Sequence, residues 1–269
     1  MVLKIVKYLF LTLAGIIVLM ALIATPLIIR ARNEGARMYE KYNRYTRDTL
    51  AQSVELTPYP IKQEYRTVHP WKGLKLLKFV IESQQGEKFK RVNTLDASLM
   101  LFMKMYTLLI LPNYGYNLPM LSVDIIFMGG RRVFVIELID PAAIKDENLE
   151  THYEKMRSWK STVSTLDKME VSMEWAENAV RDVSIHSRAD RTKDELLFDI
   201  YKSYLATYLD MAQNAKPLGA EESQKVKAGM EWYVDTLIAK GGPAVNVFKT
   251  ILGPEKQKEY VRTVMFGVD

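Results

Sequence analysis

The chain has 269 residues, of which 48% are hydrophobic and 26% charged, a length and composition that suit a folded protein with one large or two small domains. It contains no cysteine, which excludes disulfides, thiolate zinc sites and cysteine-ligated iron–sulfur clusters. The formal net charge of +5 favours acidic partners, but it does not choose among an anionic membrane face, nucleic acid and an acidic protein.

Residues 8–29 form the first predicted element. They are 22 residues without a charge, rich in Leu, Ile, Val and Ala, and a bilayer core requires roughly 20 such residues in a helix. The pattern predicts an uncleaved transmembrane helix. A cleavable signal peptide is the alternative, but the apolar stretch exceeds the usual signal core and lacks a small-residue cleavage site near Ala24.

The basic residues that flank this span predict its orientation. Lys4 and Lys7 precede it, and the segment after it is more basic, with Arg30, Arg32, Arg37, Lys41, Arg44 and Arg47. Because the more basic flank tends to stay in the cytoplasm, we expect a single-pass membrane protein whose main domain lies on the cytoplasmic side.

The segment that follows the span is polar and helix-permissive. Residues 33–53 carry apolar side chains at near-helical spacing, and Pro58 and Pro60 end the pattern. The predicted division of the chain is a transmembrane anchor over residues 1–32, a helical stalk or linker over residues 33–69, and a main domain over residues 70–269.

The main domain begins with strand-like stretches that are separated by short turns. These stretches cover residues 74–82, 89–93, 99–111, 122–128 and 132–138. Five strands in succession predict an antiparallel meander. The apolar run at 99–111 also suits a buried helix, because short apolar runs do not distinguish the two.

After Pro141 the apolar period becomes helical. Residues 149–164 are amphipathic, and further helices are predicted over residues 220–240, from Pro243, and from Pro254 through Phe266. One more helix has a single apolar face made of Leu197, Ile200, Tyr201, Tyr204, Tyr208 and Met211. Strands first and helices later predict an α+β fold, with helices on one or both faces of a sheet.

Searches for chemical motifs are mostly negative. The chain has no G-x-G-x-x-G, no G-x-x-x-x-G-K-[ST], no G-x-S-x-G and no H-E-x-x-H. His69, His152 and His186 lie far apart in the sequence, so we interpret them as surface or hydrogen-bonded histidines and predict no metal site. Aromatic and basic residues alternate only in the segment beside the predicted membrane span, so no nucleic-acid partner is predicted.

Asp124 is the most unusual residue of the strand region. The apolar runs at 118–121 and 125–128 flank it, which places this acid near a buried surface. A lone buried carboxylate costs several kcal/mol unless it is hydrogen-bonded, paired or protonated. It either serves chemistry or accepts backbone N–H groups from the preceding turn. Nearby, Arg131 and Arg132 follow two glycines, which is typical of a solvated hairpin tip.

The tyrosines of the apolar helix face allow two interpretations. Tyr201, Tyr204 and Tyr208 have planar rings that suit stacking on a flat ligand. Their three- and four-residue spacing is more typical of a hydrophobic core.

The stretch around Asp124 resembles a known family. Pro112 leads through Tyr116-Asn-Leu-Pro-Met120 to Asp124 and then to a hydrophobic strand that ends in Asp140-Pro141. The carboxyl-terminal pattern matches as well, with Phe248, Ile251-Leu252-Gly253, Tyr260 and Val264-Met265-Phe266. A weaker match is Phe89-Lys90-Arg91-Val92. Over residues 70–269 the sequence resembles the ferredoxin-dependent bilin reductases, which share a superfamily with red chlorophyll catabolite reductase.

The resemblance implies a three-layer α/β/α sandwich with a central antiparallel sheet, which holds a linear tetrapyrrole such as biliverdin against its carboxyl-terminal helices. It also implies that no flavin or metal is bound, that external reduced ferredoxin delivers electrons singly, and that carboxyl groups supply protons. In that mechanism Asp124 is the proton donor, because burial raises the pKa of a carboxylic acid and keeps its proton available.

The sequence departs from the family pattern at three positions. Thr107 stands where the best-known members have a histidine, and Leu95, with Asp96 next to it, stands where they have a glutamate. Gly241-Gly242-Pro243 replaces an aspartate that opens the penultimate helix in many members. The Thr107 hydroxyl donates hydrogen bonds but does not titrate in the working range, so it is a candidate substrate-binding residue.

Two functional hypotheses follow from the resemblance and its departures. In the first, the protein is a membrane-anchored oxidoreductase, held through residues 8–29, that reduces a bilin with electrons from an acidic ferredoxin or flavodoxin. In the second, it is a non-catalytic tetrapyrrole-binding or carrier protein with the same fold.

Overall fold

The protein is described here by a computed structural model, which places residues 2–69, 77–170 and 173–268. Its strands are β1 (Thr57–Pro58), β2 (Thr67–Val68), β3 (Leu77–Gln85), β4 (Phe89–Leu99), β5 (Met103–Pro112), β6 (Met120–Met128), β7 (Arg131–Ile139), β8 (Asp167–Lys168) and β9 (Ile185–Asp190). They form one nine-stranded sheet in the order β1-β3-β4-β5-β6-β7-β9-β8, with β2 also paired to β3. The pairs along this order are antiparallel.

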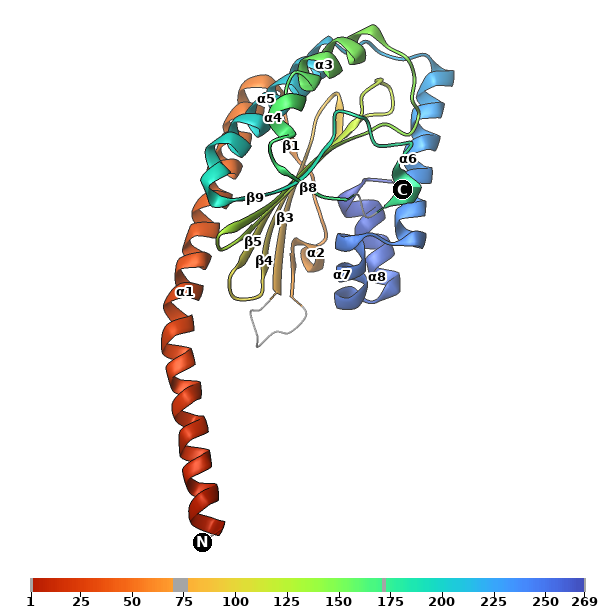
Figure 1. Ribbon diagram of the computed structural model, residues 1–269. Helices are drawn as coiled ribbons and strands as arrows, with labels where there is room; N and C mark the ends of the chain where they lie inside the picture. Colours follow the sequence, from red (N-terminus) through yellow and green to blue (C-terminus); the bar gives the residue numbers. More distant parts are fainter. Residues whose placement is uncertain (1, 70–76, 171–172, 269) are drawn as a thin grey trace.

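Helices cover both faces of this sheet (Figure 1). They are α1 (Val2–Ser53), α2 (Gln63–Arg66), α3 (Glu147–Arg157), α4 (Lys160–Val163), α5 (Asp194–Asn214), α6 (Ala220–Lys240), α7 (Pro243–Leu252) and α8 (Pro254–Glu259), and a π-helical turn (Tyr260–Met265) continues α8. The prediction of an α+β fold with a central antiparallel sheet is confirmed.

The predicted meander is the centre of the sheet, because β3 to β7 are neighbours in chain order. The ambiguous run at 99–111 is not a helix. It spans the end of β4, a turn at residues 100–102 and most of β5. Met100 has a φ of 57° in this turn, which reverses the chain tightly enough for the strands to pair. The first predicted strand, 74–82, lies partly outside the described residues.

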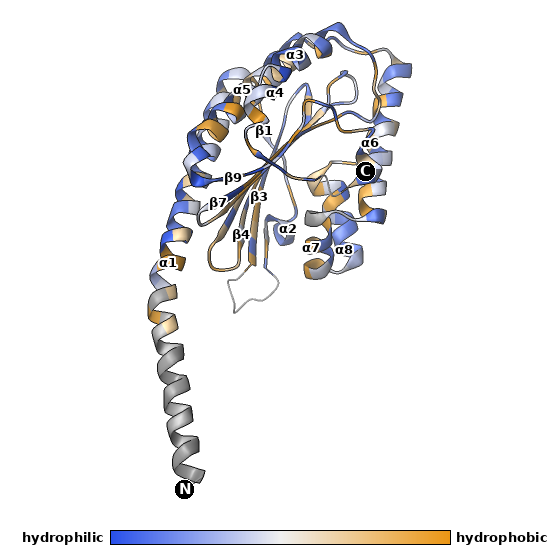
Figure 2. Ribbon diagram, in the orientation of Figure 1, coloured by the Kyte–Doolittle hydropathy of each residue, from blue (hydrophilic) through white to orange (hydrophobic). Residues whose placement is uncertain are grey.

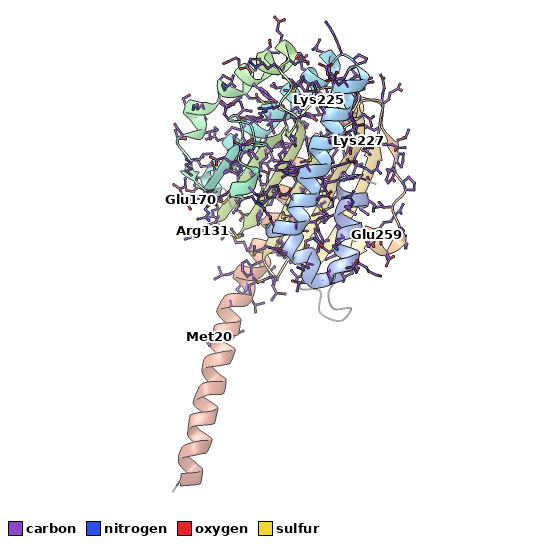
Figure 3. All side chains as sticks on the ribbon, turned by 90° about the vertical axis from the view of Figure 1, so that its right-hand side faces the viewer. Met20, Arg131, Glu170, Lys225, Lys227 and Glu259 are labelled. Carbon is purple, nitrogen blue, oxygen red and sulfur yellow. The ribbon has the colours of Figure 1, made fainter. Side chains whose placement is uncertain are left out.

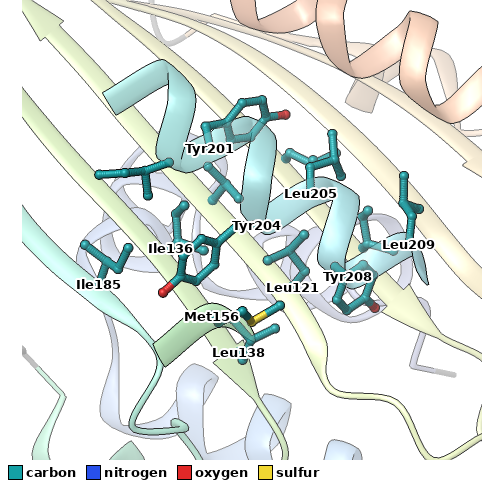
Figure 4. Close-up of a cluster of buried hydrophobic side chains, with 14 of the residues drawn as sticks. Leu121, Ile136, Leu138, Met156, Ile185, Tyr201, Tyr204, Leu205, Tyr208 and Leu209 are labelled. Carbon is teal, nitrogen blue, oxygen red and sulfur yellow. The ribbon is translucent and has the colours of Figure 1, made fainter. Parts of the chain in front are cut away.

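The first face of the sheet is covered by α1, α3 and α5. On β6 this face presents Leu121, Val123, Ile125 and Phe127, each at most 2% exposed. Figure 4 shows α5 lying across these strands with its tyrosines and leucines directed at the sheet. Tyr201, Tyr204 and Tyr208 are buried in this core cluster. The core interpretation of these tyrosines is therefore confirmed, and they lie on the opposite side of the sheet from Asp124.

The second face is covered by α6, α7, α8 and the π-helical turn. Met230, Tyr233 and Val234 of α6 pack with Leu109 and Met120 of the sheet in one cluster. A separate cluster brings Phe248 of α7 and Tyr260 and Val264 of the π-helical turn onto Phe79 and Leu95. The carboxyl-terminal helices thus form the third layer of the molecule.

Helix α1 has two different halves. Its first half projects away from the body, where Met20 is 58% exposed (Figures 1 and 3). Its second half lies against the first face of the sheet, and Met38, Tyr42 and Leu50 belong to the main core cluster. The contact with β5 is so close that a Cβ at Gly35 would lie 2.9 Å from the Cβ of Lys104. The domain boundaries at residues 32 and 69 stay a prediction, but side chains of the proposed stalk are core residues.

The predicted membrane anchor is wrong. Residues 8–29 belong to α1, which runs without interruption for 52 residues. Within the described residues, no helix is both long and apolar enough to span a bilayer. The prediction rested only on the number of uncharged residues between positions 8 and 29. The single-pass localisation with a cytoplasmic main domain loses its basis with the span.

The β6–β7 hairpin corrects a second expectation. Arg131 is exposed, as predicted for a hairpin tip (Figure 3), but the side chain of Arg132 is completely buried. The Arg132 guanidinium donates hydrogen bonds to Asp194 at 2.7 and 2.8 Å and to Glu34 at 2.5 Å. It therefore joins β7 to α1 and to the start of α5 within the first face.

Candidate active site

Asp124 lies in the middle of β6, on the second face of the sheet. Alternate residues of this strand point to opposite faces, and the two faces differ in burial. Leu121, Val123, Ile125 and Phe127 are fully buried on the first face, whereas from residue 122 onward the side chains on the second face are half-buried. These are Ser122, Asp124, Ile126 and Met128. The covering helices thus leave this part of the second face incompletely covered.

The strand register places the expected site residues side by side. Leu95 of β4 pairs with Thr107 of β5, and Thr107 pairs with Asp124 of β6. The row continues from Asp124 to Val135 of β7 and from Val135 to His186 of β9. Positions 95, 107 and 124, which the resemblance singled out, are therefore consecutive in one cross-strand row on one face.

Thr107 and Asp124 are in direct contact. The Thr107 hydroxyl donates a hydrogen bond to Asp124 Oδ1 at 2.5 Å. Burial raises the pKa of Asp124 to about 6, against a lowering by the Thr107 hydrogen bond and with a further rise from the negative charge of Glu137. Asp124 is therefore not held by the backbone of a preceding turn. Its pKa instead lies at about 6, above the usual range of an aspartate.

Two titratable residues beside Asp124 were missed from the sequence. Glu137 lies on β7, two residues along from Val135, and is 8% exposed. Its Oε1 lies 2.7 Å from His186 Nε2. Glu137 has the same signature as Asp124, a single carboxylate in an apolar strand. His186 was interpreted as a surface or hydrogen-bonded residue, and the structure gives it a hydrogen bond on the face of Asp124.

Helix α6 closes over these acids with Tyr233, which is 2% exposed. Burial raises the pKa of the Tyr233 hydroxyl, and the negative charges of Glu137 and Asp124 raise it further. A tyrosine in this position stays protonated at every working pH and lies within electrostatic range of both carboxylates.

Packing explains two of the three departures from the family pattern. Leu95 is 4% exposed and belongs to the cluster under α7. Asp96 cannot replace a glutamate at position 95, because it points to the other face and forms an ion pair with Lys104. A Cβ at Gly242 would lie 3.0 Å from Leu237 Cδ1 and 3.1 Å from Met173 Sδ. The space in which an aspartate would sit at the start of α7 is therefore occupied by apolar side chains.

Three surface pockets of the described molecule lie elsewhere. Two lie beside α1, near Arg30 and Glu34, and the third lies at the β3–β4 hairpin around Gly86. Asp124 lines none of these three pockets. The surface available at Asp124 is instead the half-buried part of the second sheet face.

Comparison with known proteins agrees with this geometry. The family model of the ferredoxin-dependent bilin reductases matches residues 43–267. A phycoerythrobilin:ferredoxin oxidoreductase of Prochlorococcus marinus is 21% identical over 232 residues, which cover 80% of this chain and 87% of the relative. A 15,16-dihydrobiliverdin:ferredoxin oxidoreductase of Gloeobacter violaceus is 22% identical over 166 residues, or 61% of this chain and 68% of the relative.

A solved structure has the same fold. Phytochromobilin synthase from tomato, crystallised in complex with biliverdin, superposes with a TM-score of 0.72 at 15% identity and covers 85% of this chain and 83% of its own. The family match includes residues 43–53 at the end of α1, the whole central sheet and the carboxyl-terminal helices. The chain belongs to the ferredoxin-dependent bilin reductase family.

Proposed function

We propose that the protein reduces a linear tetrapyrrole of the bilin class with electrons from reduced ferredoxin, and that Asp124 donates a proton to the bilin. Family membership supports the reaction class. The observation that carries the role of Asp124 is its place on the half-buried sheet face, where burial raises its pKa to about 6. General acids work best when their pKa lies near the working pH.

The reaction requires a balanced supply of electrons and protons. Reduction of one bilin double bond adds two electrons and two protons, and two reduced ferredoxins each give one electron. After an electron arrives, the bilin becomes more basic, so that a neighbouring carboxylic acid can protonate it. Asp124 then becomes a carboxylate, which the Thr107 hydroxyl stabilises by its hydrogen bond.

A flat tetrapyrrole over this face would also change Asp124 itself. In the ligand-free protein, a pKa of about 6 leaves Asp124 mostly ionised at pH 7. A bilin that covers the carboxyl excludes its remaining water, which raises the pKa further and favours the protonated acid. In this proposal, binding of the substrate shifts Asp124 toward the protonated form that donates the proton.

We propose no resident flavin or metal, since electrons come from an external carrier. The net charge of +5 would attract an acidic ferredoxin or flavodoxin and increase the rate of encounter. The hypothesis of a non-catalytic carrier is less well supported, because a carrier has no need for a group of titratable residues on its ligand face.

The test is turnover by the full-length protein. Biliverdin is added under anaerobic conditions, its bound absorbance band is recorded, and ferredoxin, ferredoxin reductase and NADPH are then supplied. We expect the wild-type spectrum to change to that of a two-electron-reduced bilin. Asp124→Asn should bind biliverdin but form product roughly 100-fold more slowly or worse, since general acids contribute on the order of 10² to 10⁴ in rate.

Two results would contradict the proposal. Binding without any reduction in the wild-type protein would show a carrier. Equal product formation by wild type and Asp124→Asn would remove the assigned role of Asp124. Thr107→Val is the companion variant, because it keeps the shape of the side chain but removes the hydroxyl that donates to Asp124.

A further inference from the structure

Three titratable side chains surround Val135 on the second sheet face. Asp124 is the partner of Val135 on β6, and His186 is its partner on β9. Glu137 lies two residues along β7 on the same face, which puts it diagonally across from both, at about 7–8 Å between Cα atoms in a regular sheet. The negative charge of Glu137 acts on Asp124, and the Glu137 carboxylate is hydrogen-bonded to His186.

The chemistry of the proposed reaction leaves a proton unaccounted for. Each two-electron reduction consumes two protons, and Asp124 holds one. Leu95 and Thr107, its neighbours in the cross-strand row, have no proton to give in the working range. A second donor must therefore lie elsewhere on this face or come from water.

We infer that the Glu137–His186 pair supplies the second proton of the reduction. This inference rests on the proposed function. In the protonated pair, an imidazolium lies against a carboxylate. The proton moves from His186 Nε2 to the Glu137 carboxylate and from there to the one-electron-reduced, singly protonated bilin as the second electron arrives. A neutral imidazole and a carboxylate remain, and His186 regains its proton from water.

The Glu137–His186 pair keeps some solvent exposure, which gives protons a path from water to the site. Glu137 is 8% exposed, and His186 is half-buried on β9, next to the edge of the sheet that the two residues of β8 form. The two side chains are about equally exposed, at 12% for His186 and 11% for Glu137, so the pair as a whole keeps limited contact with solvent beside Asp124. Histidine is the side chain best suited to this role, because it takes up and releases protons near neutral pH.

Other groups face the pair and are part of its electrostatic environment. Tyr233 of α6 and Asp124 of β6 both lie within electrostatic range of Glu137. Along the sheet edge, Arg188 follows on the same face of β9 and pairs in register with Asp167 of β8. In the described parts of the chain, no three His, Asp or Glu side chains are placed to hold a metal ion, so the geometry favours proton transfer over metal binding.

A purely structural role is the competing explanation, since the hydrogen bond also ties β9 to β7. Glu137→Gln separates the two explanations, because an amide oxygen still accepts the hydrogen bond from His186 but the side chain no longer carries a proton. Glu82→Gln is the matched control, because Glu82 is an exposed glutamate on β3 that points to the other face of the sheet.

The experiment follows reduction of bound biliverdin by absorbance and electron paramagnetic resonance, with reduced ferredoxin in excess and no oxygen. We expect Glu137→Gln to accept the first electron and accumulate the one-electron-reduced bilin, with product formation slowed roughly 100-fold. We expect His186→Gln to accumulate the same radical and to slow product formation as well, because the Glu137 carboxylate then lacks the neighbour from which it receives a proton. We expect Glu82→Gln to behave as wild type.

The outcomes distinguish the inference from the function on which it rests. If Glu137→Gln forms product at the wild-type rate, with no radical and an unchanged pH profile, the pair is structural and the inference is wrong. If wild type binds biliverdin but never reduces it, the proposed function fails and the inference fails with it. Thermal unfolding of each variant shows whether it is folded. If Glu137→Gln does not fold, His186→Gln tests the inference instead: a stably folded His186→Gln that forms product slowly supports the role of the pair as proton donor.

Discussion

The two faces of the central sheet are built from the same strands for different purposes. On the first face, α1, α3 and α5 cover side chains that are almost completely buried, and the polar groups there are tied to one another: Thr46 lies within hydrogen-bond distance of Tyr106 and Tyr201. On the second face, the middle of β6 and β7 presents half-buried residues, and a cross-strand row there includes Thr107, Asp124 and His186. The first face is thus a closed core, whereas the second face carries the proposed site.

The helices that cover both faces carry hydrophilic and hydrophobic residues in alternation (Figure 2). Half-buried titratable residues reduce the stability of a sheet interior, because burial disfavours their charged forms. Their concentration on one face, at adjacent register positions, is the feature that a purely structural sheet would lack.

The largest expected effect tests the ion network of the first face. Arg132→Leu should lower the free energy of unfolding by about 3–5 kcal/mol, because it leaves the carboxylates of Glu34 and Asp194 partly buried without their partner. Urea unfolding at neutral pH measures the change. The adjacent Arg131→Leu is the control and should change stability by less than about 0.5 kcal/mol, since Arg131 is exposed. Equal effects of the two variants would show that the network does not hold the first face together.

The next effect compares the two faces directly through neighbouring residues of β6. Ile125 is completely buried on the first face, and Ile126 is half-buried on the second. Ile125→Ala should cost about 2–5 kcal/mol in unfolding free energy, and Ile126→Ala about half of that or less, because less apolar surface is removed from water there. A larger cost for Ile126 would mean that the second face is as tightly packed as the first.

A smaller effect concerns the pH dependence of stability. The folded-state pKa of Asp124 is raised from 3.8 to about 6, so the native protein binds this proton more tightly than the unfolded chain does. The resulting stabilisation is fully present below pH 3.8 and is lost as the pH rises to about 6. It amounts to at most about 3 kcal/mol, because each pKa unit corresponds to about 1.4 kcal/mol. Asp124→Asn lacks this stabilisation at every pH. The free energy of unfolding of the variant, relative to that of wild type, should therefore rise between pH 4 and 7. Parallel stability curves for the two proteins would contradict the raised pKa.

Much of the second face could be predicted from the sequence. The meander follows from five apolar stretches with short turns, and Asp124 is conspicuous because its neighbours in the strand are apolar. Glu137 carries the same signal, because the rest of its strand consists of apolar residues and two arginines. His186 could not be placed in this way, because β9 has only six residues and its position follows from pairing with a strand far away in the sequence.

On the first face, the local sequence pattern predicted the helix but not what the helix contacts. The spacing of Met38, Tyr42 and Leu50 was interpreted as a stalk, and only the tertiary structure shows which surface that helix face contacts. The burial of Arg132 was likewise invisible, because its partners Glu34 and Asp194 are 98 and 62 residues away. A Gly-Gly turn predicts a hairpin, but it does not say which of the following side chains turns inward.

The central claim is that Asp124 is a proton donor because its surroundings keep its proton available near neutral pH. Infrared difference spectroscopy of wild type against Asp124→Asn measures this directly through the C=O stretch of the protonated carboxyl group. We predict a band that titrates with a midpoint near pH 6 in the ligand-free protein and persists to higher pH when biliverdin is bound. A carboxyl that is ionised throughout this range, with a midpoint near 3.8 in both states, would contradict the account.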